Sequence, residues 1–242
     1  IFSLNKLRDI EETAIYAGKK TEVIAVGKLI ANKSTNNARQ IFGQVVGLTI
    51  NEGTDGGLQL NIGGRGLNPN RTSNFNTRQN DYDISADVLG YPESYYATAT
   101  EALEEIQVVR GAASLQYGTQ FGGLVNFKIK SPSKKAFEAV IRNTIGSYGL
   151  YTNFTSLSGT NGKFSYYTFF NYKEGNGARP NSNFVSRNYF ANLNYQFSSQ
   201  TSLHFDYTYF DYLAKQPGGL TDFMFQENPD QSNRTRNWFD VN

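Results

Sequence analysis

The second half of the chain alternates apolar and polar residues with a period of two. In the clearest segment every second residue is apolar: Tyr189, Ala191, Leu193, Tyr195 and Phe197. The positions between them are polar, except for Phe190. Successive side chains of a β-strand point to opposite faces, so this pattern predicts a strand with one apolar and one polar face.

Neighbouring segments repeat the pattern at residues 137–145, 164–174 and 202–209. Tyr167 and Phe169 blur the second face of the middle segment, and residues 150–158 alternate least clearly. Alternating segments of about ten residues are typical of antiparallel strands that span a membrane as a β-barrel. We therefore expect about five such strands after residue 132.

The connections between these segments alternate in length. Residues 159–163 and 198–201 are short turns, whereas residues 175–184 and the stretch after Tyr212 are longer. Outer-membrane barrels have short periplasmic turns and longer external loops, so the first strand is expected to run outward from the periplasm. A soluble sandwich with one wet face would also alternate, but it explains neither this asymmetry nor the many outward aromatic residues.

The first half of the chain follows a different pattern. Residues 21–26, 58–62, 106–109 and 124–129 resemble short strands, and residues 36–46 have helical spacing before Gly47. Six glycines lie between residues 53 and 66, and residues 67–80 are expected to form a loop. The sequence therefore predicts two domains, 1–132 with mixed α+β structure and 133–242 with antiparallel strands.

Composition and charge exclude several classes of protein. The net charge of +2, from 23 basic and 21 acidic residues, is too small for a nucleic-acid partner. The chain has no cysteine, which excludes thiol catalysis and cysteine-ligated metals within it. No run approaches the roughly 18 apolar residues that a membrane-spanning helix needs. The first residues lack the features of a signal peptide, as expected of a mature or trimmed chain.

Candidate catalytic residues are sparse. His204 is the only histidine, and no Gly-x-Ser-x-Gly nucleophile motif occurs. The glycine-rich stretch lacks the Gly-Lys-Ser/Thr ending of a phosphate-binding loop. The acidic stretch 101–105 is expected to be a solvated segment before a strand. We predict that the protein is not an enzyme and contains no metal site or cofactor.

Two motifs resemble the plug domain of TonB-dependent outer-membrane receptors. Residues 109–118 read Val-Arg-Gly-Ala-Ala-Ser-Leu-Gln-Tyr-Gly and are followed by Gly-Gly-Leu-Val-Asn-Phe at 122–127. Upstream, Gly-Arg-Gly-Leu-Asn-Pro at 64–69 is similar to the ferric citrate branch of the family. One departure is Asn80-Asp81, where many members have an Asp-Gly turn.

The resemblance implies a fold and a partner. An α+β plug domain would be followed by antiparallel transmembrane β-barrel strands, an incomplete portion of the family's 22-stranded barrel. The TonB box, the segment pulled by the TonB–ExbB–ExbD complex, would lie mostly upstream of residue 1. The receptor would sit in the lipid of the bacterial outer membrane, as a monomer in its full-length form.

The resemblance also implies roles for individual residues. Arg65 and Arg110 would contact glutamates of later barrel strands, which this chain does not contain. The outward loops of the plug would supply ligand-binding residues: Arg71, Arg78, Tyr91, Tyr95 and Tyr96. Arginine pairs with carboxylates and tyrosine stacks or donates hydrogen bonds, which favours an anionic ferric chelate as the imported ligand. Cobalamin, glycan and peptide ligands remain alternatives, and a soluble binding module is the alternative from another class.

Overall fold

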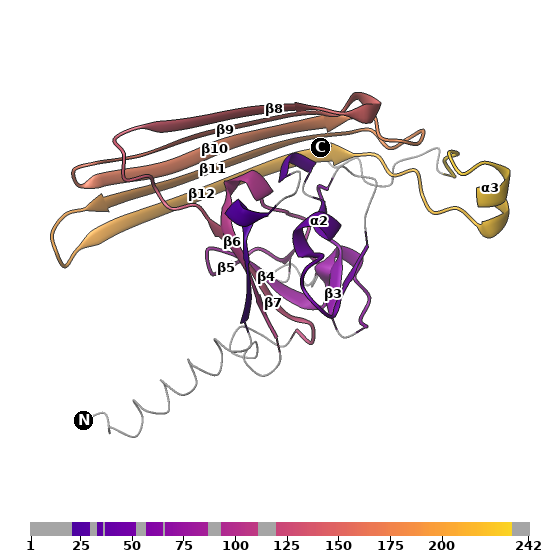
Figure 1. Ribbon diagram of the computed structural model, residues 1–242, viewed down its shortest axis with the longest axis horizontal. Helices are drawn as coiled ribbons and strands as arrows, with labels where there is room; N and C mark the ends of the chain where they lie inside the picture. Colours follow the sequence, from indigo (N-terminus) through magenta and orange to yellow (C-terminus); the bar gives the residue numbers. More distant parts are fainter. Residues whose placement is uncertain are drawn as a thin grey trace, which may run out of the picture.

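The computed structural model describes residues 21–29, 33–35, 37–51, 57–64, 66–86, 93–110 and 120–233. Two parts are visible in Figure 1: a long curved sheet, and a smaller unit that packs against one face of it. We call the described residues up to 130 the plug, and the long sheet the wall. This order, an α+β unit followed by antiparallel strands, confirms the predicted fold class.

The wall is an antiparallel meander in the order β12-β11-β10-β9-β8. Its strands are β8 (Glu138–Ile145), β9 (Tyr151–Asn161), β10 (Phe164–Gly175), β11 (Phe184–Gln196) and β12 (Ser202–Ala214). β9 continues through Gly159 to Asn161, so the turn predicted at 159–163 is shorter than expected. The last plug strand ends at Ile129, and the predicted domain boundary after residue 132 falls in the connection to β8.

The two ends of the wall differ in their connections. Tight turns join β9 to β10 and β11 to β12 at one end, which we call the short-turn end. The loops 176–183 and 215–233 lie at the other end, the long-loop end, where α3 (Asp222–Glu227) projects in Figure 1. The chain enters the wall from the plug at the short-turn end. The four predicted connections therefore differ in length as expected, whereas the β8–β9 connection at the long-loop end, residues 146–150, is short.

The plug is built around a five-stranded sheet in the order β1-β6-β7-β4-β5. These strands are β1 (Thr21–Ala25), β4 (Phe75–Gln79), β5 (Tyr82–Asp83), β6 (Leu103–Val109) and β7 (Gly123–Ile129). β2 (Leu48–Ile50) and β3 (Ile62–Gly64) form a separate pair. The helical pieces are η1 (Val26–Lys28), η2 (Lys33–Thr35), α2 (Ala38–Phe42), η3 (Asn70–Thr72) and η5 (Thr100–Ala102), while η7 (Ser147–Gly149) joins β8 to β9.

Three predicted elements of the plug were wrong in their bounds. α2 begins after Asn37, whose side chain accepts a hydrogen bond from the Gln40 amide, and it ends before Gly43 rather than Gly47. β3 lies later than the predicted strand at 58–62. The predicted loop 67–80 contains β4, which pairs in parallel with β7 and carries the buried polar residues Asn76, Thr77 and Gln79. A strand covered on both faces does not alternate in sequence, so its signal is weak.

The two faces of the wall have the predicted chemistry. The exposed face carries large apolar side chains from every strand: Ile141, Leu157, Phe170, Tyr189, Leu193, Phe205 and Tyr207. The inner face is mostly polar, with buried Thr152, Ser156, Asn171, Ser186 and Asn188. No helix in the described ranges is long and apolar enough to cross a membrane.

Aromatic rings interrupt the polar inner face where the plug packs on it. Phe169 stacks on Phe190 with ring centroids 5.6 Å apart and lies 5.7 Å from Phe154. All three belong to the hydrophobic cluster that also contains Leu103 and Ile106 of β6. The rings that blurred the sequence pattern are therefore the apolar contacts between wall and plug.

Candidate ligand site and the contacts between plug and wall

An irregular backbone positions Arg71. Arg71 and Thr72 have φ values of 47° and 54°, in the left-handed region that disfavours residues other than glycine. Fixed hydrogen bonds hold this conformation. The Arg71 amide donates to the Asn61 side chain at 2.8 Å, the Ser94 amide donates to the Arg71 carbonyl at 2.8 Å, and the Thr72 hydroxyl donates to the Leu60 carbonyl at 2.7 Å. Strain of this kind is often found at ligand sites.

The side chain of Arg71 joins two residues of the segment 93–99. Its Nη1 donates to the Tyr95 hydroxyl at 3.2 Å, and its guanidinium carbon lies 5.0 Å from the Tyr95 ring centre. The Tyr95 hydroxyl donates to a Glu93 carboxylate oxygen at 2.6 Å, and the other oxygen is 3.9 Å from Arg71. This hydrogen bond to Glu93 raises the pKa of Tyr95 because it stabilises the protonated phenol. Arg71 and Tyr95 therefore form one cluster with Glu93, which the sequence did not single out.

Tyr96 contacts the wall. Its ring lies 5.2 Å from the Phe210 ring, and its hydroxyl donates to the Gln79 side chain at 2.8 Å. Burial raises the pKa of Tyr96. Gln79 in turn donates to Thr208 of β12 at 3.0 Å. Tyr96 therefore links the plug to β12 and does not join the Arg71 cluster.

Contacts along β12 place the Arg71 cluster near the long-loop end. Three plug side chains contact β12 at positions that follow one another toward that end. The pairs are Gln79 with Thr208, Tyr96 with Phe210, and Gln59 with Tyr212. Asn61, which holds the Arg71 backbone, is two residues from Gln59. The cluster therefore lies toward the end of the wall that carries the larger loops.

Arg78 lies in a different part of the plug. Its Nε donates to the Asn76 side chain at 2.7 Å, and its Nη1 donates to the Asp81 carbonyl at 2.7 Å. Asp81 lines a cavity of about 520 Å³ that reaches Asn192 and Asn194 of β11, near the short-turn end. The structure therefore does not bring Arg71 and Arg78 together.

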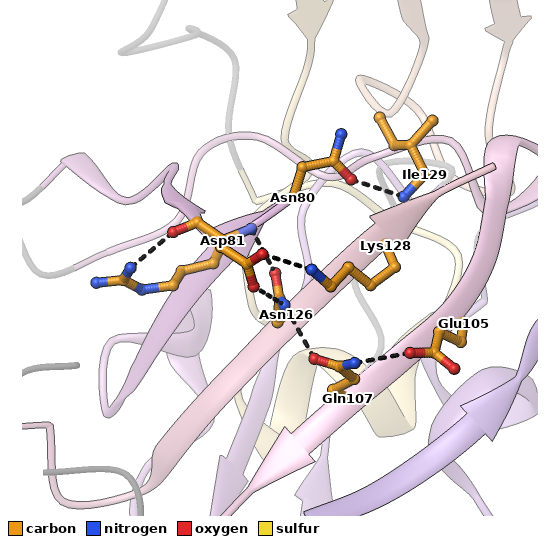
Figure 2. Close-up of polar contacts among 8 residues, drawn as sticks. Asn80, Asp81, Glu105, Gln107, Asn126, Lys128 and Ile129 are labelled. Atoms are coloured by element: carbon orange, nitrogen blue, oxygen red, sulfur yellow. Dashed lines mark hydrogen bonds and ion pairs between the residues drawn. The ribbon is translucent and has the colours of Figure 1, made fainter. Parts of the chain in front are cut away.

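A polar network surrounds Asp81, as Figure 2 shows. The Asp81 carboxylate accepts from Lys128 Nζ at 2.5 Å and from the Asn126 amide nitrogen at 2.8 Å. Asn126 also donates to Gln107, which donates to Glu105 at 2.7 Å. The hydrogen bond from Lys128 is the main reason why the pKa of Asp81 lies below its usual value. The network joins the β4–β5 turn to β7 and β6.

The Asn80–Asp81 turn resolves the departure from the family pattern. Both residues have positive φ, 49° and 71°, as a tight hairpin turn requires. Asn80 also accepts a hydrogen bond from the Ile129 amide at 3.0 Å through its side chain (Figure 2). Asparagine tolerates the left-handed region, so the turn forms without glycine.

Arg110 makes its described contacts within the plug. It forms an ion pair with Glu22 of β1 and donates to the Val46 carbonyl at 2.5 Å. Its contact with barrel glutamates stays a prediction. Arg65, Tyr91 and the motif residues 111–118 lie outside the described residues.

Glu101 is a plug–wall contact that the sequence did not reveal. It lies in η5, its side chain is only 4% exposed, and its carboxylate is 3.4 Å from Arg142 Nη1 of β8. The expectation that Glu101 is a solvated residue was wrong, whereas Glu104 of the same stretch is exposed. Burial raises the pKa of Glu101, and Arg142 and Lys173 act in the opposite direction. No local pattern marks this residue, because its partner is 41 positions away.

Together these features define a plug that fills the inner side of a partial β-barrel wall. The family comparison agrees: residues 19–124 match the TonB-dependent receptor plug domain. This part of the chain is therefore a TonB-dependent receptor plug domain, as the sequence resemblance indicated. No curated protein sequence matches the chain.

Solved structures share the fold of both parts. The ferric citrate transporter FecA in its unliganded form matches with a TM-score of 0.74 and 24% identity, over 88% of this chain and 34% of that one. The siderophore receptor PirA from Pseudomonas aeruginosa gives 0.61 and 18%, over 80% and 34%. The ferripyoverdine receptor of the P. aeruginosa outer membrane, bound to ferripyoverdine, gives 0.56 and 19%, over 69% and 22%.

The chain spans about a third of the length of the first two structures. Its fold is that of TonB-dependent receptors, with an incomplete barrel. These comparisons agree with the predicted resemblance to TonB-dependent receptors.

Proposed function

We propose that the protein belongs to a receptor that actively imports a ferric chelate across the bacterial outer membrane, driven by the TonB–ExbB–ExbD complex. One observation carries this proposal: a plug domain packs into the inner face of a barrel wall through both apolar and charged contacts. A passive pore needs no such domain, whereas an active importer must stay closed until it is energised. The wall would lie in the outer membrane, with its exposed apolar face toward lipid.

The Arg71 cluster supports an anionic, oxygen-rich ligand. Arg71 offers a planar guanidinium that pairs with carboxylates, and Tyr95 offers a ring and a hydroxyl. The hydrogen bonds around Arg71 and Thr72 fix the cluster before any ligand arrives, which lowers the entropic cost of binding. The structural neighbours include a ferric citrate transporter, a siderophore receptor and a receptor bound to ferripyoverdine.

We assign Arg71 and Tyr95 to the ligand site, with Tyr91 as a further candidate in the same region of the sequence. Arg78 and Tyr96 were expected to join them, and their positions favour other roles. Arg78 holds the β4–β5 turn, and Tyr96 holds the plug against β12. Arg65 and Arg110 remain proposed contacts between plug and barrel.

A binding titration tests the ligand assignment. The full-length receptor is titrated with ferric citrate, a ferric hydroxamate, cobalamin and a neutral oligosaccharide, and then again with Arg71→Ala and Arg78→Ala. We expect tight binding of a ferric chelate, with Arg71→Ala weakening it by roughly tenfold or more because a charge-assisted contact is lost. Tight binding of the oligosaccharide, unchanged by Arg71→Ala, would contradict the ferric assignment.

A further inference from the structure

Glu101 occupies an unusual electrostatic position between plug and wall. Its buried carboxylate faces Arg142 of β8, and Lys173 of β10, which is 2% exposed, adds a second positive charge from the wall. On the plug side, Lys130 Nζ donates to the Glu101 carbonyl at 2.7 Å. The carboxylate therefore interacts with two cations of the wall, and the backbone of the same residue is bonded to a cation of the plug.

In the part of the chain that the structure describes, the other carboxylate that acts on Lys130 has partners of its own. The other groups that act on Lys130 are Lys33, which adds positive charge, and Glu138. Glu138 accepts a hydrogen bond from Ser133 at 2.6 Å and lies 3.9 Å from Lys135, so it is engaged elsewhere. Removing the charge of Glu101 would leave Arg142, Lys173 and Lys130 near one another without their shared carboxylate.

Glu101 also lies at a mechanically important point in the plug. It comes two residues before β6, the strand that pairs with both β1 and β7. β1 pairs with β6 from Thr21, opposite Val109, to Ala25, opposite Glu105. A pull on the N-terminal segment therefore loads β1 first, then β6, and Glu101 ties the beginning of β6 to the wall.

The two ends of β6 are held in different ways. Arg110, directly after β6, is paired with Glu22 of β1, which is a contact inside the plug. Glu101, before β6, is paired with the wall. Beside this second contact, a cavity of about 430 Å³ extends from Lys130 to Ser156 and Ser158 of β9, so the segment has open space next to it.

We propose that the Glu101–Arg142 pair is a latch that keeps β6 on the wall while β1 is pulled away, and that its release controls transport without controlling ligand affinity. Glu101 and Arg142 are positioning residues in this scheme, because they are remote from the Arg71 cluster in the described contacts. The transport part of this inference rests on the proposed import function. The structural part, a charge-dependent anchor of β6, does not.

Hydrogen exchange of the full-length receptor tests the anchor without any transport. Glu101→Gln keeps the size of the side chain and one acceptor oxygen but removes its charge. We expect amides of β6 to exchange at least roughly tenfold faster, because one partner of a buried ion pair is lost. Glu104→Gln, an exposed neighbour in the same acidic stretch, is the matched control and should leave the exchange unchanged.

A double-mutant cycle assigns the effect to the pair. In an Arg142→Met background, Glu101→Gln should change the exchange of β6 by less than about twofold, because the interaction is already absent. Arg142→Lys should retain most of the protection. Equal effects of Glu101→Gln with and without Arg142 would overturn the latch, and so would unchanged exchange in the single variant.

Cross-linking tests the role in transport. Glu101→Cys and Arg142→Cys are introduced together and joined with a short bis-maleimide whose spacer contains a disulfide. Energised uptake of the ferric chelate should fall to background after cross-linking and return after reduction of the spacer. The cross-link should change the dissociation constant of the chelate by less than about twofold. Uptake at the rate of the unlinked variant, despite complete cross-linking, would overturn the proposal. If the unmodified receptor shows no energised uptake, the import function itself fails, and hydrogen exchange still decides the anchor.

Discussion

Phe169 offers the sharpest test of how the plug is held in the wall. Its side chain is 1% exposed and stacks on Phe190, within the cluster shared with β6 of the plug. Truncating a buried phenylalanine costs ~3–5 kcal/mol in total, but the rings of Phe154 and Phe190 belong to the wall and stay beside Phe169 when the plug leaves. We therefore assign about half of this cost to the plug and expect Phe169→Ala to lower the free energy of plug release by ~1–3 kcal/mol.

The assay is denaturant-dependent hydrogen exchange of β6 amides in the detergent-solubilised full-length receptor, which reports the free energy of opening of the plug. Phe170→Ala is the matched control, because Phe170 is the next residue of β10, points to the opposite face and is 41% exposed. The control should change plug opening by less than about 0.5 kcal/mol. If both variants lowered it equally, or if Phe169→Ala cost less than about 1 kcal/mol, the aromatic contact would not hold the plug.

Three further predictions concern single residues. Arg71→Lys should weaken chelate binding nearly as much as Arg71→Ala, because lysine lacks the planar fork, and a titration that shows full retention would exclude bidentate recognition. Asn80→Ala should destabilise the plug by ~1–3 kcal/mol, because the hydrogen bond from the Ile129 amide is lost and alanine is strained at this positive φ. Asn80→Gly relieves the strain, so thermal unfolding should show that it recovers part of the lost stability. The pKa of Asp81 is lowered in the folded plug, so its contribution is present above the unfolded value near pH ~3.9 and is lost as pH falls through the folded pKa. Asp81→Asn should flatten that acid dependence of unfolding, and an unchanged profile would assign it to other groups.

The wall was the part of the fold most accessible from the sequence. Its strands have one face toward the plug and one exposed apolar face, so period-two alternation appears directly in the residues. Phe169 and Phe190 are exceptions to this alternation. The structure explains them, because they lie where the plug packs on the polar inner face. From the sequence alone they could not be distinguished from irregularities.

The plug was less predictable because two of its strands, β4 and β7, are covered on both faces. β4 carries Asn76, Thr77 and Gln79 in buried positions, and the side chains of Asn76 and Gln79 bond to Asp83 and Thr208. The local sequence does not predict those hydrogen-bond partners. The same reason explains Glu101, whose burial depends on Arg142 in another domain.

The candidate site was predicted only in part. Arginine and tyrosine were sensible choices for an anionic ligand, but sequence proximity did not indicate which of them converge. Arg71 and Tyr95 meet because the Ser94 amide hydrogen-bonds to the Arg71 carbonyl, whereas Arg78 lies seven residues further along the chain, within β4. Glu93 was missed, since an isolated acid gave no signal of a role.

Concentrative uptake by a receptor without its plug tests the central claim most directly. Cells producing the full-length receptor, or a version that lacks residues 1–130, are given a radiolabelled ferric chelate with and without a protonophore. We predict that the full-length receptor accumulates the chelate against its gradient only without the protonophore, and that the shortened version permits at most leakage. Accumulation against the gradient by the receptor that lacks residues 1–130 would contradict the account.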